Sequence, residues 1–531
     1  MSQEKLNVIW LLVDSVRNYR TGIDDRDRLA VMDKLAEECL EFEKVIVSAP
    51  SSVMSVSAMM TGVPSYQIAR DYENFKFDPQ AFTSLPQILS ARGYQTVGLP
   101  FFSEGRDKFK NLFSLIDKKY WPRGLKYGKK YWSNDDMNHI LQNFINRGLK
   151  EPFFLFAHYD VRNDPQTSEK VEKIINLFKE REIFQRSIFI LSSDHGYPDP
   201  SRGMGPKWFK DRGLSHDMVL TNDNIFIPLL LKYPGSESMK ILTAISTLDI
   251  TPTIMELLEI RQDSRMKGLM QGRSLLPLIE GKVRPEEFES RYIRVDNRFL
   301  CQTGRCTALF HRDKKYVFSY DDNRESFFDL AEDPLEIDSL VNENRIKDEL
   351  AKFRKTFSEM SHEANLCHFK YVLNGIRSHL SQPLDSGHAV LLVDVVSNGR
   401  VDFLIDIIHE ALQPSAIDLI TSQDSILQYH GDKIRKVMSL DEANSNFRSF
   451  STEIKDYAKI VVWTNKKSQS NLRFINKKCQ NILFIDSNMD VIDRHHRGAL
   501  LLKRVQSRLR LYLREPLIFV DDVKRRLFKK P

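Results

Sequence analysis

Short, mostly apolar runs alternate with helical stretches from Leu6 to about Asn365. The runs are bounded by turn residues and read NVIWLLVD, TVGLP, PFFLFAHYD, SIFILSSD and FIPLLLKYP. Near-continuous apolar strands that alternate with helices are typical of a parallel sheet covered on both faces. The pattern therefore predicts an α/β domain in this part of the chain.

A second alternation of strands and helices begins near Gly387, with the runs AVLLVDVV, AIDLITS, KIVVWTN and NILFIDSN. Strand and helix repeated over about 110 residues favour a small Rossmann-like α/β domain. It has neither a GxGxxG loop nor a P-loop, so its ligand cannot be read from the sequence. We predict a domain at 1–365, with a smaller subdomain at 290–360, and a Rossmann-like domain at 380–531 that ends in a basic tail.

Polar residues follow three of the predicted strands of the first domain. Asp14 ends the first run, Asp194 and His195 end another, and His158 ends a third. Ligands of parallel sheets bind beyond the carboxyl ends of the strands, and carboxylate oxygens with imidazole nitrogen suit a divalent cation. A strand-end Asp can also simply cap the next helix, which is the commoner role for Asp14 taken alone.

Several motifs resemble the sulfatase-like branch of the alkaline phosphatase superfamily, in family order over about residues 6–345. They are the strand ending in Asp14-Ser15-Val16-Arg17, the segment 48–62 that ends in MMTG, SDHG at 193–196, IPLLLKYPG, LDITPTIMELLEI, GRSLLPLI and FFDLAEDPLEIDSL. The resemblance implies a mixed sheet flanked by helices and a metal-dependent ester hydrolase or transferase.

The resemblance also assigns roles to residues. It implies one divalent ion, Mn, Ca, Zn or Mg, held by Asp14, Asp194 and His195, with the Ser52 oxygen completing the site. Ser52 would be the nucleophile, and His216 the general acid that protonates the leaving group. Ser15 stands where many relatives have a second Asp. The implied substrate-binding residues are Lys207, His158 and Asn163.

One departure from the family pattern favours a phosphate ester as substrate. Sulfatases convert the first residue of a Cys/Ser-x-Pro-x-Arg motif to formylglycine, but the stretch from Ser52 to Val56 lacks both the Pro and the Arg. We therefore expect an unmodified serine that acts on a phosphodiester or phosphonate monoester, by hydrolysis or phospho-group transfer. The alternatives are a sulfuric ester hydrolase and a non-catalytic member that binds a glycan or phosphate.

The excess positive charge lies in the predicted second domain, which contains none of the candidate catalytic residues. The 531 residues carry a formal charge of +6, and residues 361–531 hold 26 Lys and Arg against 19 Asp and Glu. We expect the second domain to recognise a glycan or nucleotide-linked substrate, or to form a homo-oligomer; nucleic acid is not expected as a partner. The apolar run at the start is too short for a membrane span and lacks a basic leader, which predicts a cytoplasmic protein.

Overall fold

The computed structural model describes two compact units, 1–299 with 303–361 and 300–302 with 362–531. Within them, the residues described are 5–18, 29–68, 77, 79, 81–162, 164–199, 216–262, 268–297, 306–319, 323–378, 389–394, 405, 408, 410, 412, 414, 416–421, 434–439, 459–463, 482–485 and 491–493. Among these, no helix has both the length and the apolar character needed to cross a bilayer.

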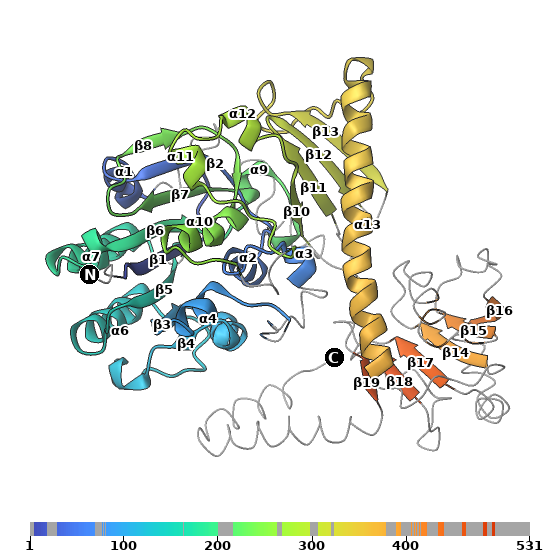
Figure 1. The fold of residues 1–531 in the computed structure, drawn as a ribbon, viewed down its shortest axis with the longest axis horizontal. Helices are drawn as coiled ribbons and strands as arrows, with labels where there is room; N and C mark the ends of the chain where they lie inside the picture. Colours follow the sequence, from blue (N-terminus) through green and yellow to red (C-terminus); the bar gives the residue numbers. More distant parts are fainter. Residues whose placement is uncertain are drawn as a thin grey trace. The chain divides into compact units, whose positions relative to one another are not determined.

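A nine-stranded sheet forms the centre of the first unit (Figure 1), in the order β4-β3-β5-β1-β6-β7-β2-β8, with β9 paired to β2. Its strands are β1 (Asn7–Asp14), β2 (Leu40–Ile46), β3 (Gln95–Pro100), β4 (Ser114–Leu115), β5 (Phe153–Asp160), β6 (Ser187–Ser193), β7 (Phe226–Lys232), β8 (Met239–Ile241) and β9 (Ile245–Ser246). The strands β1, β5 and β6 are buried along almost their whole length, which explains their near-continuous apolar sequences.

The sheet is mixed rather than wholly parallel. β7 pairs antiparallel with both β6 and β2, whereas the other described pairings are parallel. The mixed sheet implied by the family resemblance is confirmed, and the parallel sheet read from the apolar runs is wrong at β7. A strand covered on both faces is apolar whichever way it runs, so its sequence does not reveal its direction.

Two groups of helices pack in this unit. One group contains α1 and α6, which both contact α7, and the other contains α2, α3, α10 and α11. The helices are α1 (Ala30–Ala36), α2 (Ser52–Met59), α3 (Ser65–Ile68), α4 (Leu85–Ser90), α5 (Ser103–Lys108), α6 (Asn134–Arg147), α7 (Thr167–Glu180), α9 (Asn222–Ile225), α10 (Ile250–Leu257), α11 (Leu276–Ile279) and α12 (Pro285–Phe288). Helix α2 is buried on almost every side, in keeping with its uncharged sequence.

A four-stranded antiparallel sheet follows, formed by β10 (Ile293–Asp296), β11 (Cys306–His311), β12 (Lys314–Ser319) and β13 (Arg324–Asp329). The start of α13 (Lys347–Ser378) packs on it through a cluster that includes Tyr316, Phe327 and Phe353. Lys315 of this sheet is fully buried and donates to the Leu220 carbonyl of the main domain. The small sheet is therefore joined to the loop that precedes β7.

The second unit contains a six-stranded sheet in the order β16-β15-β14-β17-β18-β19. Its strands are β14 (Ala389–Asp394), β15 (Ala416–Thr421), β16 (Ile434–Ser439), β17 (Lys459–Trp463), β18 (Ile482–Ile485) and β19 (Val491–Asp493). The first five are parallel and β19 is antiparallel. Taken in chain order this is 3-2-1-4-5-6, which agrees with the prediction of a Rossmann-like sheet. The basic tail after 493 lies outside the described residues.

Candidate active site

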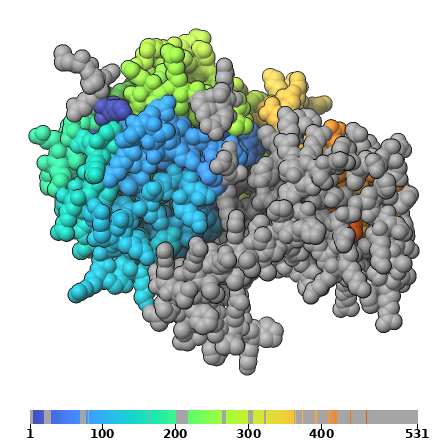
Figure 2. Space-filling model, turned by 60° about the horizontal axis from the view of Figure 1, so that its bottom comes forward, coloured from blue at the N-terminus to red at the C-terminus, as the bar shows by residue number. Residues whose placement is uncertain are grey.

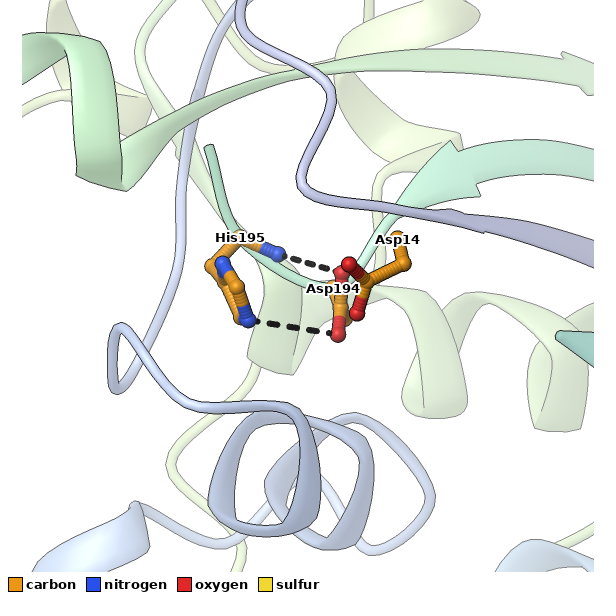
Figure 3. A group of neighbouring side chains, drawn as sticks. All are labelled: Asp14, Asp194 and His195. Atoms are coloured by element: carbon orange, nitrogen blue, oxygen red, sulfur yellow. Dashed lines mark hydrogen bonds and ion pairs between the residues drawn. The ribbon is translucent and has the colours of Figure 1, made fainter. Parts of the chain in front are cut away.

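The carboxyl ends of three neighbouring strands bring the predicted metal ligands together. In the parallel register, Asp14 of β1 lies beside Asp160 of β5, and Val13 lies beside Ser193, the residue before Asp194. One ligand atom from each of Asp14, Asp194 and His195 can be chosen so that all three lie within 4.8 Å of one another (Figure 3). A pocket of about 450 Å³ opens beside them and is lined in part by Asp14, Ser52 and His216.

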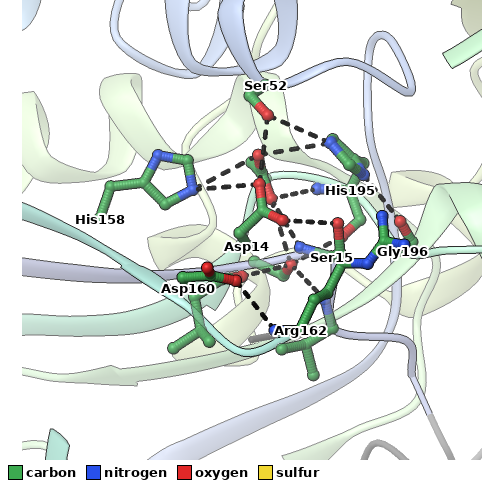
Figure 4. Close-up of polar contacts among 12 residues, drawn as sticks. Asp14, Ser15, Ser52, His158, Asp160, Arg162, His195 and Gly196 are labelled. Carbon is green, nitrogen blue, oxygen red and sulfur yellow. Dashed lines mark hydrogen bonds and ion pairs between the residues drawn. The ribbon is translucent and has the colours of Figure 1, made fainter. Parts of the chain in front are cut away.

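Ser15 holds both carboxylates in place. Its backbone N–H donates to Asp194 Oδ1 at 3.1 Å, and its hydroxyl donates to Asp14 Oδ2 at 2.7 Å (Figure 4). The residue has φ 62°, a left-handed conformation that is uncommon for a side chain other than glycine. Backbone strain of this kind is typical of functional sites, where it aims a polar group. Ser15 thus positions both predicted metal ligands, Asp14 and Asp194.

His195 presents one nitrogen to the site. Its Nδ1 lies 2.7 Å from the Gly196 carbonyl oxygen, which can only accept, so Nδ1 donates to it and Nε2 is the nitrogen that can bind a cation in exchange for a proton. The turn requires glycine at 196, because a Cβ there would lie 2.1 Å from the Asp223 carbonyl oxygen. Gly196 in turn donates its N–H to the Asn224 carbonyl at 2.8 Å. This contact ties the end of β6 to helix α9.

The electrostatics of the cluster favour a bound cation. Burial and the neighbouring charge of Asp194 raise the pKa of Asp14. Burial also acts against ionisation of Asp194, but the charges of His195 and His158 hold its pKa far below the usual range. Asp194 Oδ2 is buried and accepts no hydrogen bond among the described residues. Two buried carboxylates, one carrying such an oxygen, with an imidazole nitrogen are donors that a divalent metal ion fits.

Ser52 stands at the first position of α2 and faces the cluster. Its Oγ lies 3.3 Å from Asp14 Oδ1, to which it donates, and 3.2 Å from His195 Nε2. The hydroxyl is partly exposed and lines the pocket, whereas the other residues of α2 are buried. The first N–H groups of a helix have no carbonyl within the helix to bond, so they favour an anion at this end. The nucleophile predicted from sequence is thus in contact with two of the predicted ligands.

His158 lies behind the ligands rather than in the pocket. It is fully buried, and its Nε2 lies 3.4 Å from Asp194 Oδ2 and 3.8 Å from Asp14 Oδ1. The rings of Phe101 and Phe102 meet it edge-on, with centroids 5.4 and 5.5 Å away. The sequence analysis assigned His158 to substrate binding, but this position favours a role in orienting Asp194.

His216 lies at the opposite rim. Its ring centroid is 5.0 Å from that of His195 and 5.3 Å from that of Tyr197. Burial, followed by the charges of His195 and Arg162, lowers the pKa of His216 to about 3. The imidazole is therefore neutral at pH 7 in the free site, and it becomes a proton donor only where a bound anion raises its pKa.

An aromatic wall of Phe101, Phe102 and Tyr131 lines the pocket away from the ligands. A buried arginine holds this wall. Arg106 donates to the carbonyls of Phe101 (2.6 Å) and Pro100 (3.2 Å), and its guanidinium carbon lies 4.0 Å from the Trp132 ring centroid. The segment around 100–150, light blue to cyan in Figure 2, covers a wide area of the surface on that face. No motif in the sequence pointed to this wall.

Two predicted substrate-binding residues, Lys207 and Asn163, lie outside the described residues. Sequence reasoning missed the positioning role of Ser15 and overlooked Arg162, which lines the pocket one residue before Asn163. The signal for both was their place directly after strands β1 and β5.

A mixed sheet whose strand ends gather two carboxylates, an imidazole and a helix-start hydroxyl defines a candidate metal-binding site of the kind that the family resemblance implies. A family model described as Sulfatase matches residues 6–170, and a second, N-sulphoglucosamine sulphohydrolase, C-terminal, matches residues 208–363. The first unit therefore contains a Sulfatase family domain followed by a region that matches the C-terminal part of N-sulphoglucosamine sulphohydrolase, in agreement with the sulfatase-like resemblance of the motifs.

Relatives of this chain include sulfatases and a phosphonate hydrolase. Choline-sulfatase from Rhizobium meliloti (strain 1021) is 29% identical over 177 residues, which cover 33% of this chain and only 31% of that protein. The phosphonate monoester hydrolase of Agrobacterium radiobacter has a TM-score of 0.53 at 12% identity, covering 68% of this chain and 96% of that one. A 2-O GAG sulfatase has a TM-score of 0.54 at 14% identity, covering 68% and 93%. The two structural likenesses show a shared fold.

Proposed function

We propose that the first unit is a metal-dependent hydrolase or transferase that acts on a phosphate ester, of the phosphodiester or phosphonate monoester type, through Ser52. The observation that carries this proposal is the contact of Ser52 Oγ with both Asp14 Oδ1 and His195 Nε2 at the pocket wall. Asp14, Asp194 and His195 would hold one divalent ion, and Ser52 would complete its coordination.

Each residue of the site has a separate role in the proposed reaction. A bound divalent ion would lower the pKa of the Ser52 hydroxyl and neutralise charge on the ester oxygens. Ser52 gives up its hydroxyl proton to solvent, and its Oγ forms the new bond to phosphorus while the bond to the departing alcohol breaks, which leaves a phosphorylated or phosphonylated Ser52. His216 gives the alcohol its proton once the negative charge of the bound ester has raised the imidazole pKa. Water or an acceptor hydroxyl then releases the phosphoryl group from Ser52.

The test combines a substrate panel with a variant of the nucleophile. Nitrophenyl phosphate, bis-nitrophenyl phosphate, a phenylphosphonate ester and nitrophenyl sulfate are each assayed with Mn²⁺, Ca²⁺, Zn²⁺ and Mg²⁺. We expect turnover of a phosphorus ester and a loss of at least about 1,000-fold in kcat for Ser52→Ala. Full activity of Ser52→Ala on every cleaved substrate would contradict the mechanism. Ser55→Ala, one turn along α2, is the matched control.

A sulfate ester is the second candidate, because the matching family model is Sulfatase and the curated relative is named a choline-sulfatase. The segment from Ser52 to Val56 lacks the Pro and Arg of the modification motif, which disfavours this reading. Mass spectrometry of the peptide that contains Ser52 decides between them. A mass loss of about two hydrogens, as serine oxidation to an aldehyde requires, would support the sulfatase reading.

A further inference from the structure

Among the described residues that line the pocket, carboxylates outnumber basic side chains. Its lining includes the carboxylates of Asp14, Glu104 and Asp160, and helix α2 contributes no charged side chain. Among the described lining residues, Arg162 is the one permanently positive side chain. An anionic ester entering this pocket would meet that guanidinium.

Contacts of both its backbone and its side chain hold Arg162 in position. Its backbone N–H donates to Asp160 Oδ1 at 2.9 Å, which closes the turn directly after β5. Its guanidinium carbon lies 3.6 Å from the centroid of the Tyr197 ring, in a cation–π stack. Figure 4 shows the side chain rising from the end of β5 toward the side of the site that holds His195 and Gly196. A stacked guanidinium keeps its N–H edge directed outward.

Arg162 has no carboxylate partner in the described part of the chain. Of the lining carboxylates, Glu104 is paired with Lys108 at 2.8 Å, and Lys108 itself does not line the pocket. The Arg162 side chain is exposed, and among the described residues its guanidinium stacks on Tyr197 and forms no ion pair. A rigid, charged fork left free at the mouth of an otherwise acidic pocket is suited to a tetrahedral oxyanion, which it can bind through two parallel hydrogen bonds.

We propose that Arg162 binds the non-bridging oxygens of the phosphoryl or sulfuryl group during transfer, with Tyr197 as the surface that orients it. This inference rests on the proposed function, because it names the substrate group that the same site receives. Arg162 is then a catalytic residue that touches the reacting group, and Tyr197 is a positioning residue that acts through it.

The experiment compares Arg162→Met, Arg162→Lys and the control Arg147→Met in the full chain. Arg147 is an exposed arginine at the end of α6 and does not line the pocket. Each protein is assayed on the best substrate of the panel, and inorganic phosphate binding is measured by calorimetry in the presence of the activating metal. We expect Arg162→Met to lower kcat/KM by about 10- to 100-fold and to weaken phosphate binding by about 10-fold. We expect Arg162→Lys to have kcat/KM and phosphate affinity between those of the natural protein and Arg162→Met, because lysine keeps the positive charge but cannot form two parallel hydrogen bonds.

The outcomes separate the two proposals. If the natural protein and Arg147→Met turn over an ester and Arg162→Met equals them in kcat/KM and phosphate affinity, the role of Arg162 is overturned while the proposed function stands. If no ester is cleaved but phosphate binds and Arg162→Met weakens it, the proposed function fails and the anion site is supported. Absence of both turnover and phosphate binding in the natural protein overturns both. Equal melting temperatures of all variants show that any loss is not one of folding.

Discussion

Replacing Asp14 by Asn is expected to stabilise the metal-free protein and to abolish its response to metal. The carboxylates of Asp14 and Asp194 lie in one cluster, with a ligand atom of each within 4.8 Å, and burial together with the charge of Asp194 raises the pKa of Asp14. At an effective dielectric constant of about 20, two unit charges at that distance repel by about 3.5 kcal/mol. Attraction to His195 and His158 offsets part of this, so the expected gain is about 1–2 kcal/mol.

The gain converts to a small but measurable rise in melting temperature. The first unit has about 360 residues, so its unfolding entropy of about 0.75 kcal/mol per kelvin gives a shift of about 1.3 °C for each kcal/mol. In EDTA, Asp14→Asn should therefore melt about 1–3 °C above the natural protein. At a metal concentration of 100 times Kd, the natural protein gains about 2.7 kcal/mol, or about 3.5 °C, and Asp14→Asn gains nothing.

Asp194→Asn provides the matched control. It is the same replacement of a carboxylate by an amide, but it is expected to lower the stability of the metal-free protein. Positive charge on His195 and His158 holds the pKa of Asp194 far below its usual range, so its charge stabilises the metal-free fold. Its loss should lower stability in EDTA by about 3 kcal/mol, or about 4 °C. Both variants are followed by calorimetry with and without metal. The reasoning is refuted if Asp14→Asn melts lower than the natural protein in EDTA and still shifts upward with metal.

Three further changes test how the site is held. Ser15→Ala removes the hydroxyl that donates to Asp14 Oδ2 and should weaken metal affinity about 10-fold in a calorimetric titration, with little change in EDTA stability. Gly196→Ala places a Cβ 2.1 Å from a backbone carbonyl oxygen and should lower the free energy of unfolding by at least about 3 kcal/mol. Its control is Gly235→Ala, where no atom lies within 4 Å of the new Cβ, so only the positive φ should lower stability, by about 1–2 kcal/mol. Equal urea midpoints of the two variants would contradict the close approach at Gly196. Arg106→Met leaves buried carbonyls without donors, so it should lower the free energy of unfolding in urea by about 3 kcal/mol. It should also raise KM, because Arg106 holds the aromatic wall. An unchanged KM would show that the wall does not contribute to substrate binding.

The metal cluster could be predicted from sequence because its members follow directly from the topology. Asp14, His158 and Asp194 end apolar strands, and strands that are parallel neighbours deliver their ends to one edge. The direction of β7 could not be predicted, since burial on both faces erases the pattern that would distinguish the two directions. The burial of His158 behind the predicted ligands could not be predicted either, because a strand-end residue can point into the pocket or behind it.

Residues that act through backbone conformation were invisible in the sequence for a different reason. The role of Ser15 depends on φ 62°, which aims its N–H at Asp194, and no neighbouring glycine or asparagine marked the position. The contribution of Arg106 depends on carbonyls of a loop that returns to it from residues 127–129. A lone arginine in a polar stretch gives no sign that it will be fully buried. Such contacts arise only when distant segments meet.

The absence of a basic residue on α2 and the free guanidinium after β5 are two parts of one electrostatic arrangement. A cation bound by Asp14 and Asp194 would neutralise charge on the substrate oxygens nearest to it, and Arg162 would serve the remaining oxygens. The described lining is acidic except for Arg162, and the stack on Tyr197 holds the guanidinium at the rim. Attraction to a guanidinium scales with the charge of the group that it binds, so removal of Arg162 should cost a doubly charged ester more than a singly charged one. In Arg162→Met, kcat/KM should therefore fall more for a phosphate monoester than for a phosphate diester.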